Sequence, residues 1–586
     1  MELTGQQQSF IAAEGRHLLL LGGPGAGKTT ISIHKAKSIV EKGKLLSGQK
    51  VLFLSFARAS VARIAEAING KDKSLYKLVE INTYHAFFWQ IINTHGYLLG
   101  LPRKLSILLP HNEAIALSGI RNTALSASDK KLKEHEKIFE IANTQGRVAF
   151  SLFAQCVKDI LSCQKILRQI SDTYPFIVLD EFQDTDDGQW ENVKLLGENS
   201  SLLALADPEQ RIYDFAGADQ ARIQHYREQF NPAEFNLGTE NHRSLGTDIA
   251  LFGKEILAGR FSKKVYDGIV FMDFPANESQ SLSRLKFYAL KRIKELAKQS
   301  NGWTLAILVP TKNKMRQVSD YFLKDTPHIS HTAMIDTEGV VLAAELIAFL
   351  LQPPQEKSFD KFIELLGGFF QGKNGNKITR KDISKAQKLQ ASLSSFAVNT
   401  CRPNDKINLT YAAYKATNTV NLAGHPEQDW RAIRDCMENG ECEFLKEVAL
   451  EAKNIRLLKK GKFIRETLAN SWKDNGYYHN AVEMVKVSFQ QEHLAIASEE
   501  PHGVFIMNIH KSKGKQFDEV ILFEWYNPRY NQNYNMDRFV APSNKKSAIS
   551  QSNRQLFMVG ITRARKRTTI MTPKNDPCVL LESGFI

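Results

Sequence analysis

The sequence predicts an α/β protein with two parallel-sheet domains, each interrupted by a mainly helical insertion. Apolar runs of strand length alternate with helical patterns near both ends of the 586-residue chain. Strand patterns disappear in two long internal stretches. A glycine-rich segment stands directly between the first apolar run and the first helical pattern, as at the first strand-to-helix turn of many parallel sheets.

The first half of the chain has the rhythm of strand, helix, strand. A helix is expected after each of the first two strands. Residues from about Tyr97 to Ile170 turn helical and charged, which predicts the first insertion. The strands around it are expected at Leu18–Leu21, Val51–Ser55, Val79–Asn82, Phe176–Leu179 and Leu202–Ala206.

A second α/β section begins near Asn241. From about Pro353 to Glu499 the sequence is helical, which predicts the second insertion, with loops at Gly368–Asn376 and Asn399–Lys406. The apolar run near Val340–Leu351 is too short to span a bilayer. The strands of this section are expected at Ile269–Phe274, Thr304–Pro310, Val504–Ile509, Val520–Phe523 and Thr568–Thr572.

Composition narrows the class of protein. Hydrophobic residues make up 43% of the chain and charged residues 24%, as in ordinary globular proteins. The formal net charge of +14 favours a polyanionic partner, and nucleic acid is the first candidate. The six cysteines form no C-x-x-C pair, so their spacing indicates neither a zinc site nor a disulfide framework. The start of the chain lacks the pattern of a secretory signal, and we expect a cytoplasmic protein with no membrane partner.

The glycine-rich segment fits the pattern G-x-x-x-x-G-K-[ST]. Its glycines let backbone N–H groups turn toward phosphate oxygens, and the helix that follows adds the positive end of its dipole. Lys28 is placed to reach the outer phosphates of a nucleotide, and the Thr29 hydroxyl to bind Mg²⁺. The segment reads Gly22, Gly23, Pro24, Gly25, Ala26, Gly27, Lys28 and Thr29.

Two carboxylates end the predicted strand Phe176–Leu179. Ligands of open α/β sheets bind beyond the carboxyl ends of the strands, so Asp180 and Glu181 are expected near the glycine loop. Asp180 is placed to hold Mg²⁺ beside Thr29, and Glu181 to orient and deprotonate an attacking water.

At this point the sequence resembles the UvrD/Rep/PcrA family of superfamily 1A DNA helicases. The stretch Asp180–Asp186 resembles motif II of that family, and its other motifs follow in the family's order from residue 3 to residue 567. The resembling stretches are Leu3–Gln7 (Q motif), Phe53–Ala59 (motif Ia), Asn82–Ala86 (the next strand-contacting motif), Leu205–Ala218 (motif III), Glu240–Ser244 (motif IV), Met507–Phe517 (motif V) and Val559–Arg565 (motif VI).

The resemblance implies ATP and Mg²⁺ as cofactors. It gives Gln7 to the adenine edge and makes Gln210 the sensor of the γ-phosphate. Arg243 and Arg563 would approach the phosphate from the second domain, where a rigid guanidinium suits the developing charge. Further nucleotide contacts are implied at Thr30, His242, Gly514 and Gln516. The catalytic set is therefore Lys28, Asp180, Glu181, Gln210, Arg243 and Arg563, with Thr29 and Asp180 at the metal.

The resemblance also implies contacts with DNA. Phe56, Tyr213 and Phe215 stand where the family stacks bases of single-stranded DNA, a sequence-tolerant contact worth about 1–3 kcal/mol per base. Core packing is the alternative for these rings. Phosphate contacts are implied at Thr83, His85, Asn508 and His510. Lys511, Lys513 and Lys515 are either part of a phosphate track or a solvated face.

Four positions depart from the family pattern. The tyrosine that stacks on adenine is replaced by His242, the arginine after the loop threonine by Thr30, and the ribose-contacting glutamate by Gln516. In motif III the usual Trp-Arg-Gly reads Phe215-Ala216-Gly217. The first three changes loosen the expected grip on base and sugar, and the fourth removes a cation from the DNA track.

The implied architecture has two RecA-like motor domains. We expect domain 1A at residues 1–95 and 166–244, insertion 1B at 96–165, domain 2A at 245–353 and 500–586, and insertion 2B at 354–499. The implied function is an ATP-dependent translocase on single-stranded DNA and a 3′→5′ helicase, acting on single strands or 3′-tailed duplexes. The alternative is a DNA- or nucleotide-sensing ATPase subunit of an anti-phage nuclease complex of the Gabija type, with a nuclease as partner.

Overall fold

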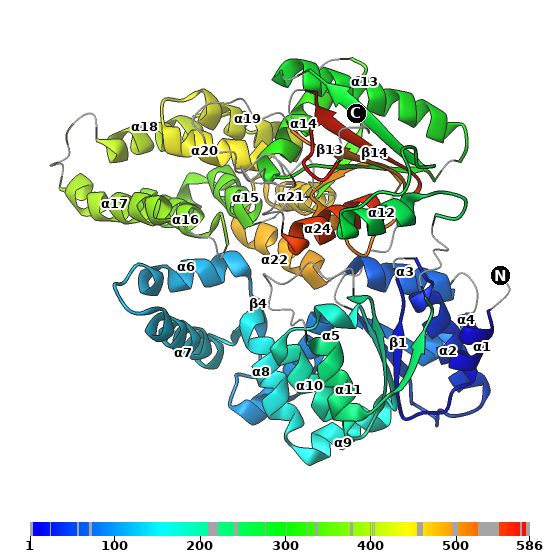
Figure 1. Cartoon of the computed structure of the whole chain (residues 1–586). Helices are drawn as coiled ribbons and strands as arrows, with labels where there is room; N and C mark the ends of the chain where they lie inside the picture. Colours follow the sequence, from blue (N-terminus) through cyan, green and yellow to red (C-terminus); the bar gives the residue numbers. More distant parts are fainter. Residues whose placement is uncertain are drawn as a thin grey trace. The chain divides into compact units, whose positions relative to one another are not determined.

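The computed structural model describes residues 4–23, 25–55, 58–69, 73–208, 221–238, 244–275, 277–300, 302–324, 326–334, 338–375, 379–398, 400, 402, 405–453, 461–494, 502–525, 539, 550–574 and 577–581. The chain divides into two compact units (Figure 1). The first contains residues 1–95, 154–335 and 496–586, and the second contains residues 96–153 and 336–495.

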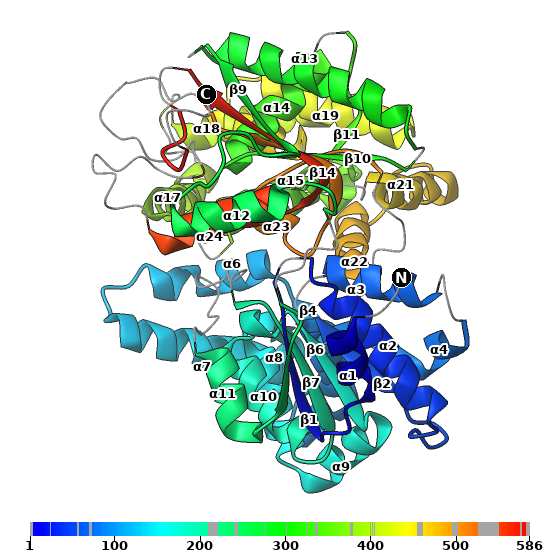
Figure 2. The same cartoon turned by 45° about the vertical axis from the view of Figure 1, so that its right-hand side comes forward.

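The first unit contains two separate parallel sheets, each with six strands in the described residues. The strand order of the first sheet is β3-β2-β6-β7-β1-β8. Figure 2 shows α1 to α4 on one face of this sheet and α10 and α11 on the other. Its strands are β1 (His17–Leu21), β2 (Val51–Ser55), β3 (Val79–Thr83), β6 (Phe176–Asp180), β7 (Ser201–Ala206) and β8 (Ala233–Asn236).

The helices around the first sheet lie between its strands in the sequence, except α1, which precedes β1. They are α1 (Gly5–Ala12), α2 (Lys28–Glu41), α3 (Arg58–Asn69), α4 (Lys73–Leu78), α5 (Tyr84–His95), α9 (Gln164–Thr173), α10 (Asp187–Gly197) and α11 (Arg222–Phe230), with a 3₁₀ turn η2 (Phe182–Asp184). The helix α8 (Phe150–Leu161) runs from the second unit into the first.

The second sheet has the strand order β11-β12-β10-β13-β14-β9. Figure 2 shows α13 and α14 on one face and α12 and α24 on the other. The strands are β9 (Ile269–Phe274), β10 (Thr304–Leu308), β11 (His331–Met334), β12 (Gly503–Met507), β13 (Phe517–Phe523) and β14 (Ala564–Pro573). The helices are α12 (Ile249–Ala258), α13 (Glu278–Ala297), α14 (Lys312–Lys324), α23 (Ile509–Ser512) and α24 (Gln551–Ile561).

Central strands of both sheets are buried on both faces, because helices cover each side. All five residues of β2 and all seven of β13 are buried. The edge strand β8 is largely exposed and polar by contrast. The hydrophobic runs therefore form the middle of each sheet and hold the strand ends in fixed positions.

The second unit is mainly helical in its described part, with one two-stranded sheet of β4 (Ser106–Leu108) and β5 (Arg147–Ala149). Every residue of α15 from Gly339 to Leu351 is buried. The other elements are η1 (Gly96–Leu99), α6 (Pro110–Arg121), α7 (Ala127–Gln145), α15 (Glu338–Leu351), η5 (Pro354–Glu356), α16 (Phe359–Gly372), α17 (Arg380–Ala397), α18 (Lys406–Asn418), α19 (Pro426–Asn439), α20 (Glu443–Ala452), α21 (Gly461–Asn475) and α22 (Ala481–Leu494).

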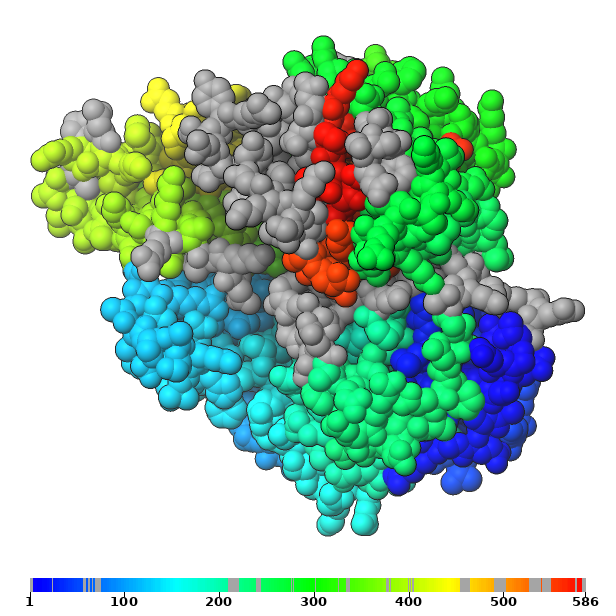
Figure 3. Space-filling view, viewed as in Figure 1, coloured from blue at the N-terminus to red at the C-terminus, as the bar shows by residue number. Residues whose placement is uncertain are grey.

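Helix α6, from the earlier segment of this unit, packs directly against α16 from the later one. Figure 3 shows the light-blue and yellow-green segments in contact. Glycines make this approach possible: a Cβ on Gly372 would lie 2.9 Å from the His111 carbonyl oxygen, and a Cβ on Gly368 would lie 3.3 Å from Ile115. The two segments thus share one helical core.

The strands expected from the sequence are confirmed in both sheets, with ends that differ by at most four residues. The loop prediction for Gly368–Asn376 is wrong over residues 368–372, which form the last turn of α16. Glycines there serve close helix packing, and the sequence pattern does not distinguish that use from a turn. Strands β4, β5, β8 and β11 have no counterpart among the sequence predictions.

Candidate active site

The candidate site lies at the carboxyl ends of four neighbouring strands of the first sheet. The order β2-β6-β7-β1 places the end of each strand beside the next. Ser55 pairs in register with Asp180, and Leu21 pairs with Ala206. Because all pairs are parallel, the residues that follow these strands meet at one edge.

The glycine loop connects β1 to α2. Gly25 and Gly27 have φ of 80° and 82°, in the left-handed region that glycine tolerates without strain. Gly27 is the N-cap of α2 and offers no side chain to its first turn, so no side-chain cap occupies the N–H groups there. Backbone hydrogen bonds from Gly22 N to Ala206 O and from Gly23 N to Gly238 O tie the loop to the sheet. The loop fits a nucleotide phosphate, since the backbone N–H groups at the N-terminus of α2 have no side-chain cap and can donate to it.

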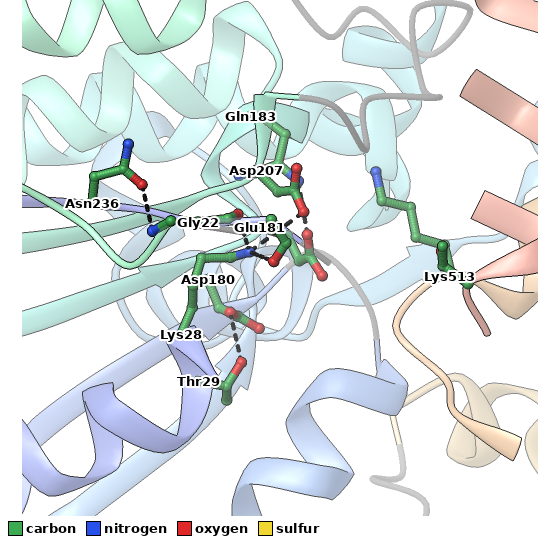
Figure 4. Close-up of polar contacts among 12 residues, drawn as sticks. Gly22, Lys28, Thr29, Asp180, Glu181, Gln183, Asp207, Asn236 and Lys513 are labelled. Atoms are coloured by element: carbon green, nitrogen blue, oxygen red, sulfur yellow. Dashed lines mark hydrogen bonds and ion pairs between the residues drawn. The ribbon is translucent and has the colours of Figure 1, made fainter. Parts of the chain in front are cut away.

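Lys28 is folded back over this loop. Its Nζ donates to Gly22 O at 2.7 Å and to Gly23 O at 3.1 Å, and lies 3.5 Å from Asp207 Oδ2 (Figure 4). Two carbonyls and one carboxylate therefore hold the cation next to the loop. A phosphate bound there would compete with them for the same ammonium group.

Thr29 and Asp180 face each other across the start of α2 and the end of β6. The Thr29 hydroxyl donates to Asp180 Oδ1 at 3.4 Å (Figure 4). The Ser55 hydroxyl donates to Asp180 Oδ2 at 3.3 Å. Asp180 is buried. The hydroxyl and the carboxylate are hard oxygen ligands close enough to share one Mg²⁺, a metal that uses few protein ligands beside water and phosphate.

Glu181 has a left-handed backbone, with φ 54° and ψ 41°, which is uncommon for a residue other than glycine. Its Oε2 accepts a hydrogen bond of 2.7 Å from Gln183 Nε2. The Gln183 Oε1 accepts a hydrogen bond of 3.0 Å from the backbone N of Asp207. Figure 4 shows these side chains beside Lys28. The structure thus brings Lys28, Asp180 and Glu181 together at one strand edge.

Asp184 forms a buried ion pair with Lys513, which comes from the half of the unit that holds the second sheet. Lys513 Nζ lies 2.8 Å from Asp184 Oδ1 and 2.6 Å from Oδ2. Burial raises the pKa of Asp184 to about 7, against the lowering effect of Lys513, and the charges of Glu181 and Asp207 add to the rise. Lys513 is therefore neither a solvated side chain nor an exposed part of a phosphate track.

The two neighbouring lysines differ from Lys513. Lys511 is exposed. Lys515 donates to Lys511 O at 2.7 Å, and burial, together with the charge of Lys511, lowers its pKa to about 8. Their contact with a phosphate backbone stays a prediction.

The turn after Glu181 is braced by Arg222, which is 1% exposed. Its Nε donates to Thr185 O at 3.0 Å, and its Nη2 lies 2.6 Å from Asp187 Oδ1. The guanidinium also lies 5.6 Å from the centre of the Trp190 ring. These contacts fix the far end of the acidic turn.

The predicted adenine contact, Gln7, is buried in α1. It forms a capping box with Thr4: Thr4 N donates to Gln7 Oε1 at 3.1 Å, and Gln7 N donates to Thr4 Oγ1 at 3.3 Å. Lys35 of α2 joins this helix to the glycine-loop helix, since its Nζ donates to Ile11 O at 2.9 Å and to Ala13 O. Burial and the charges of Lys42 and Lys44 lower the pKa of Lys35 to about 8.

The nucleotide contacts predicted in the second half of the unit lie around β13, α23 and α24. Arg563 is buried at the start of β14, and its Nε donates to Val559 O at 2.9 Å. Gly514 has φ of 77°, which leaves this turn to glycine, and Gln516 is half-buried. The approach of Arg563 to the glycine loop stays a prediction.

Two predicted phosphate contacts, Thr83 and Asn508, are helix caps. Thr83 Oγ1 accepts from Ala86 N at 3.1 Å at the start of α5, and Asn508 Oδ1 accepts from Lys511 N at 2.9 Å at the start of α23. His85 is exposed and His510 half-buried, each in the first turn of the helix that follows. Both helices therefore begin with a fixed cap and an accessible histidine.

Thr30 is exposed in the first turn of α2. The remaining predicted residues lie outside the described part of the chain: Pro24, Phe56, Gln210, Tyr213, Phe215, His242 and Arg243.

Sequence reasoning missed the roles of four residues in the site. Gln183, Asp184 and Asp207 stand inside recognised motifs, but their contacts join segments far apart in the sequence. Asp207 directly follows a predicted strand, which is the one signal that could have marked it. Arg222 carries no sequence signal, because its partners are main-chain and acidic groups of another segment.

Two searches of the described residues bear on other classes of protein. They contain no group of three or more His, Cys, Asp or Glu residues placed to hold a metal ion. Within the same part of the chain, every helix is too short or too polar to cross a membrane.

The fold and the glycine loop define a P-loop nucleotide-binding protein, and residues 6–216 match the sequence model of an AAA domain. Residues 277–575, about half of the chain, match the model of the UvrD-like helicase C-terminal domain. The chain belongs to the UvrD-like helicase family.

Relatives of known name are distant in sequence. The chain is 24% identical over 308 residues to DNA helicase II of Salmonella typhimurium, covering 46% of this chain and 42% of the relative. It is 22% identical over 632 residues to a probable DNA helicase II homolog of Rickettsia conorii, covering 96% of this chain and 91% of the relative. It is 21% identical over 281 residues to the ATP-dependent DNA helicase PcrA of Staphylococcus aureus, covering 42% of this chain and 38% of that protein.

The Salmonella alignment therefore spans under half the length of that relative. Among solved structures, the Pif1 helicase of Candida albicans aligns with a TM-score of 0.28 and 11% sequence identity. The alignment covers 56% of this chain and 56% of that chain.

Proposed function

We propose that this chain is an ATP-dependent translocase on single-stranded DNA that unwinds duplexes in the 3′→5′ direction. The observation that carries the proposal is the meeting of Lys28, the Thr29–Asp180 pair and Glu181 at one sheet edge, in a chain of the UvrD-like helicase family. Phosphoryl transfer needs charge stabilisation and a positioned water, and these residues supply both kinds of group.

The residues take separate roles at a bound nucleotide. Bound Mg²⁺ would neutralise charge on the outer phosphates, held by Thr29 and Asp180. Lys28 exchanges the carbonyls of Gly22 and Gly23 for phosphate oxygens. Glu181 orients the attacking water and takes its proton.

Residues from both halves of the unit complete this proposed site. Arg243 and Arg563 bring cations to the transferred phosphate, Gln210 senses it, and Gln7 reads the adenine edge. His242, Thr30, Gly514 and Gln516 line the base and the sugar. Because Arg563 belongs to the half with the second sheet, nucleotide binding pulls the two halves together and hydrolysis releases them.

The DNA track is proposed along both halves of the first unit. Phe56, Tyr213 and Phe215 stack bases, while Thr83, His85, Asn508 and His510 contact phosphates. The formal charge of +14 supports a polyanionic ligand. The domain boundaries given by the resemblance stay part of this proposal: 1–95 and 166–244 (1A), 96–165 (1B), 245–353 and 500–586 (2A), and 354–499 (2B). A cytoplasmic location belongs to it as well.

Strand displacement by the purified chain tests the proposal. We expect unwinding of a duplex with a 3′ single-stranded tail, and none of the same duplex with a 5′ tail. ATP hydrolysis should increase when single-stranded DNA is added. Hydrolysis that DNA stimulates without any unwinding, and unwinding that appears when a nuclease partner is added, would favour the regulatory subunit of an anti-phage complex instead.

A further inference from the structure

The amide of Gln183 is held at both ends between two parts of the site. Its side chain is 2% exposed. The backbone N–H of Asp207 can only donate, so the atom that faces it at 3.0 Å is the oxygen Oε1. The amide nitrogen Nε2 must then face Glu181 Oε2, 2.7 Å away. The network leaves this amide one orientation.

The backbone around Glu181 depends on the same turn. Glu181 has a left-handed conformation, and such a conformation costs on the order of 1 kcal/mol or more for a side chain of this size. The 3₁₀ turn η2 follows at once, with Asp184 N donating to Glu181 O at 2.9 Å. This turn points the side chain of Gln183 back at the carboxylate two residues earlier.

The other end of the amide rests on a second segment of the site. Asp207 follows β7, and its carboxylate lies 3.5 Å from Lys28 Nζ. One buried amide thus connects the turn that carries Glu181 to the residue that faces the loop lysine. Gln183 contacts Glu181 and the backbone of Asp207, so it acts on the site through Glu181.

We propose that Gln183 is a positioning residue that aims the Glu181 carboxylate for proton abstraction, with its own orientation set by the backbone of Asp207. The inference rests on the proposed function, in which Glu181 is the base. A fixed hydrogen-bond donor removes rotational freedom from the carboxylate and so holds it in the geometry that the reaction needs.

Gln183→Glu is the sharpest test because it changes one donor into an acceptor at constant shape. The Asp207 N–H still finds an oxygen, while Glu181 loses its donor and gains a neighbouring carboxylate. The two like charges repel, so the Glu181 carboxylate turns away from the position that it holds in the wild type. We expect kcat of DNA-stimulated ATP hydrolysis to fall about tenfold to hundredfold, with the KM for ATP within about twofold.

Gln189→Glu is the matched control. Gln189 is also buried, six residues further on, and its Oε1 accepts from Asp186 N at 3.3 Å in a capping box that a glutamate completes equally well. Its kcat and its KM for ATP should match those of the wild type. Gln183→Asn provides a second variant that introduces no charge. It keeps both polar groups on a shorter stem, and we expect a lower kcat with an unchanged KM for ATP.

Three results separate the outcomes. A wild-type kcat in Gln183→Glu, or an equal fall of kcat in Gln189→Glu, overturns the inference. Should Gln183→Glu fail to fold, wild-type kcat in Gln183→Asn overturns it as well. Glu181→Gln belongs in the same panel: near-normal turnover there contradicts the proposed function itself, whereas an inactive Glu181→Gln with an unaffected Gln183→Glu contradicts this inference alone.

Discussion

At the scale of single residues, the site is a set of charges held in place by buried polar contacts. Lys28 is held by two carbonyls, Asp180 by two hydroxyls, and Asp184 by Lys513. Each charge has a partner before any nucleotide binds. A bound nucleotide therefore replaces existing contacts and does not add an unpaired charge to a buried site. Lys513 is notable because its partner belongs to the other half of the unit.

The first prediction concerns Asp184, whose pKa burial raises from 3.8 to about 7. Between these values the folded chain retains a proton that the unfolded chain has lost. The stability contributed by this group is therefore fully present below the unfolded pKa and declines as the pH rises through the folded pKa. The melting temperature of the wild type minus that of Asp184→Asn should fall from pH 4 to pH 8.

Thermal unfolding of both proteins in matched buffers at each pH measures this difference. Taking the difference between two nearly identical chains removes the titration of every other group. A difference that stays constant with pH, or that grows as the pH rises, would show that Asp184 is ionised throughout this range.

At the scale of elements, the helices that carry site residues are fastened to one another. The helix α1 bears Gln7, and its last carbonyls accept hydrogen bonds from Lys35 of α2. Helix α2 bears Lys28 and Thr29 at its other end. A buried ammonium group thus closes the open end of one helix and joins the predicted base contact to the phosphate loop.

The second prediction is that Lys35→Met loosens α1 and weakens nucleotide binding. Hydrogen bonds from a charged donor contribute about 1.5–3 kcal/mol, so the loss of both should raise the KM for ATP about tenfold. Because α1, the helix that loosens, carries none of the catalytic residues, kcat should change less than about twofold. Steady-state ATP hydrolysis measures both constants.

Lys37→Met is the control for this change. Lys37 stands on the same helix, with its side chain 43% exposed, and lies 3.7 Å from Glu41, a surface pair of little energetic weight. If Lys35→Met and Lys37→Met have the same KM for ATP, the hydrogen bonds from Lys35 to α1 do not contribute to nucleotide binding.

At the scale of the whole molecule, segments distant in sequence form each unit, three in the first and two in the second. In the second unit, residues 96–153 and 336–495 share one helical core. Helix α15 is buried throughout, and its Glu345 lies 3.7 Å from His111 of α6. The close approach of α6 to α16 depends on Gly368 and Gly372.

The third prediction tests that packing. A Cβ at position 372 would lie 2.8 Å from Leu342 Cδ1 and 2.9 Å from a backbone oxygen of α6. Overpacking of this kind costs about 1–3 kcal/mol, so Gly372→Ala should lower the melting temperature of the transition that involves this unit. Differential scanning calorimetry of the full chain measures it.

Gly119→Ala is the matched control, since Gly119 is an exposed position of α6 where an added Cβ has no atom within 4 Å. Removing a helical glycine there should stabilise the protein by about 0.5–1 kcal/mol. Equal shifts of the melting temperature in the two variants would mean that the contact between α6 and α16 accommodates an added methyl group.

The sequence predicted the central strands and the ligand-binding edge because long apolar runs and a glycine loop are local signals. It missed β8 and β11, which are short edge strands with few apolar residues to mark them. It offered two interpretations of Lys513, and neither was a buried ion pair, because the partner Asp184 lies 329 positions away. The contact of Gln183 with the backbone of Asp207 escaped it for the same reason: it exists only once β6 and β7 are neighbours.

The most direct measurement of the central claim is ATP turnover by Glu181→Gln in the presence of single-stranded DNA, beside a nucleotide-binding measurement on the same protein. Glutamine keeps the shape of the side chain and removes the base, while Lys28, Thr29 and Asp180 remain to bind the nucleotide. The account predicts near-wild-type binding with turnover reduced at least about a hundredfold. Near-normal turnover in this variant would contradict the assignment of the site.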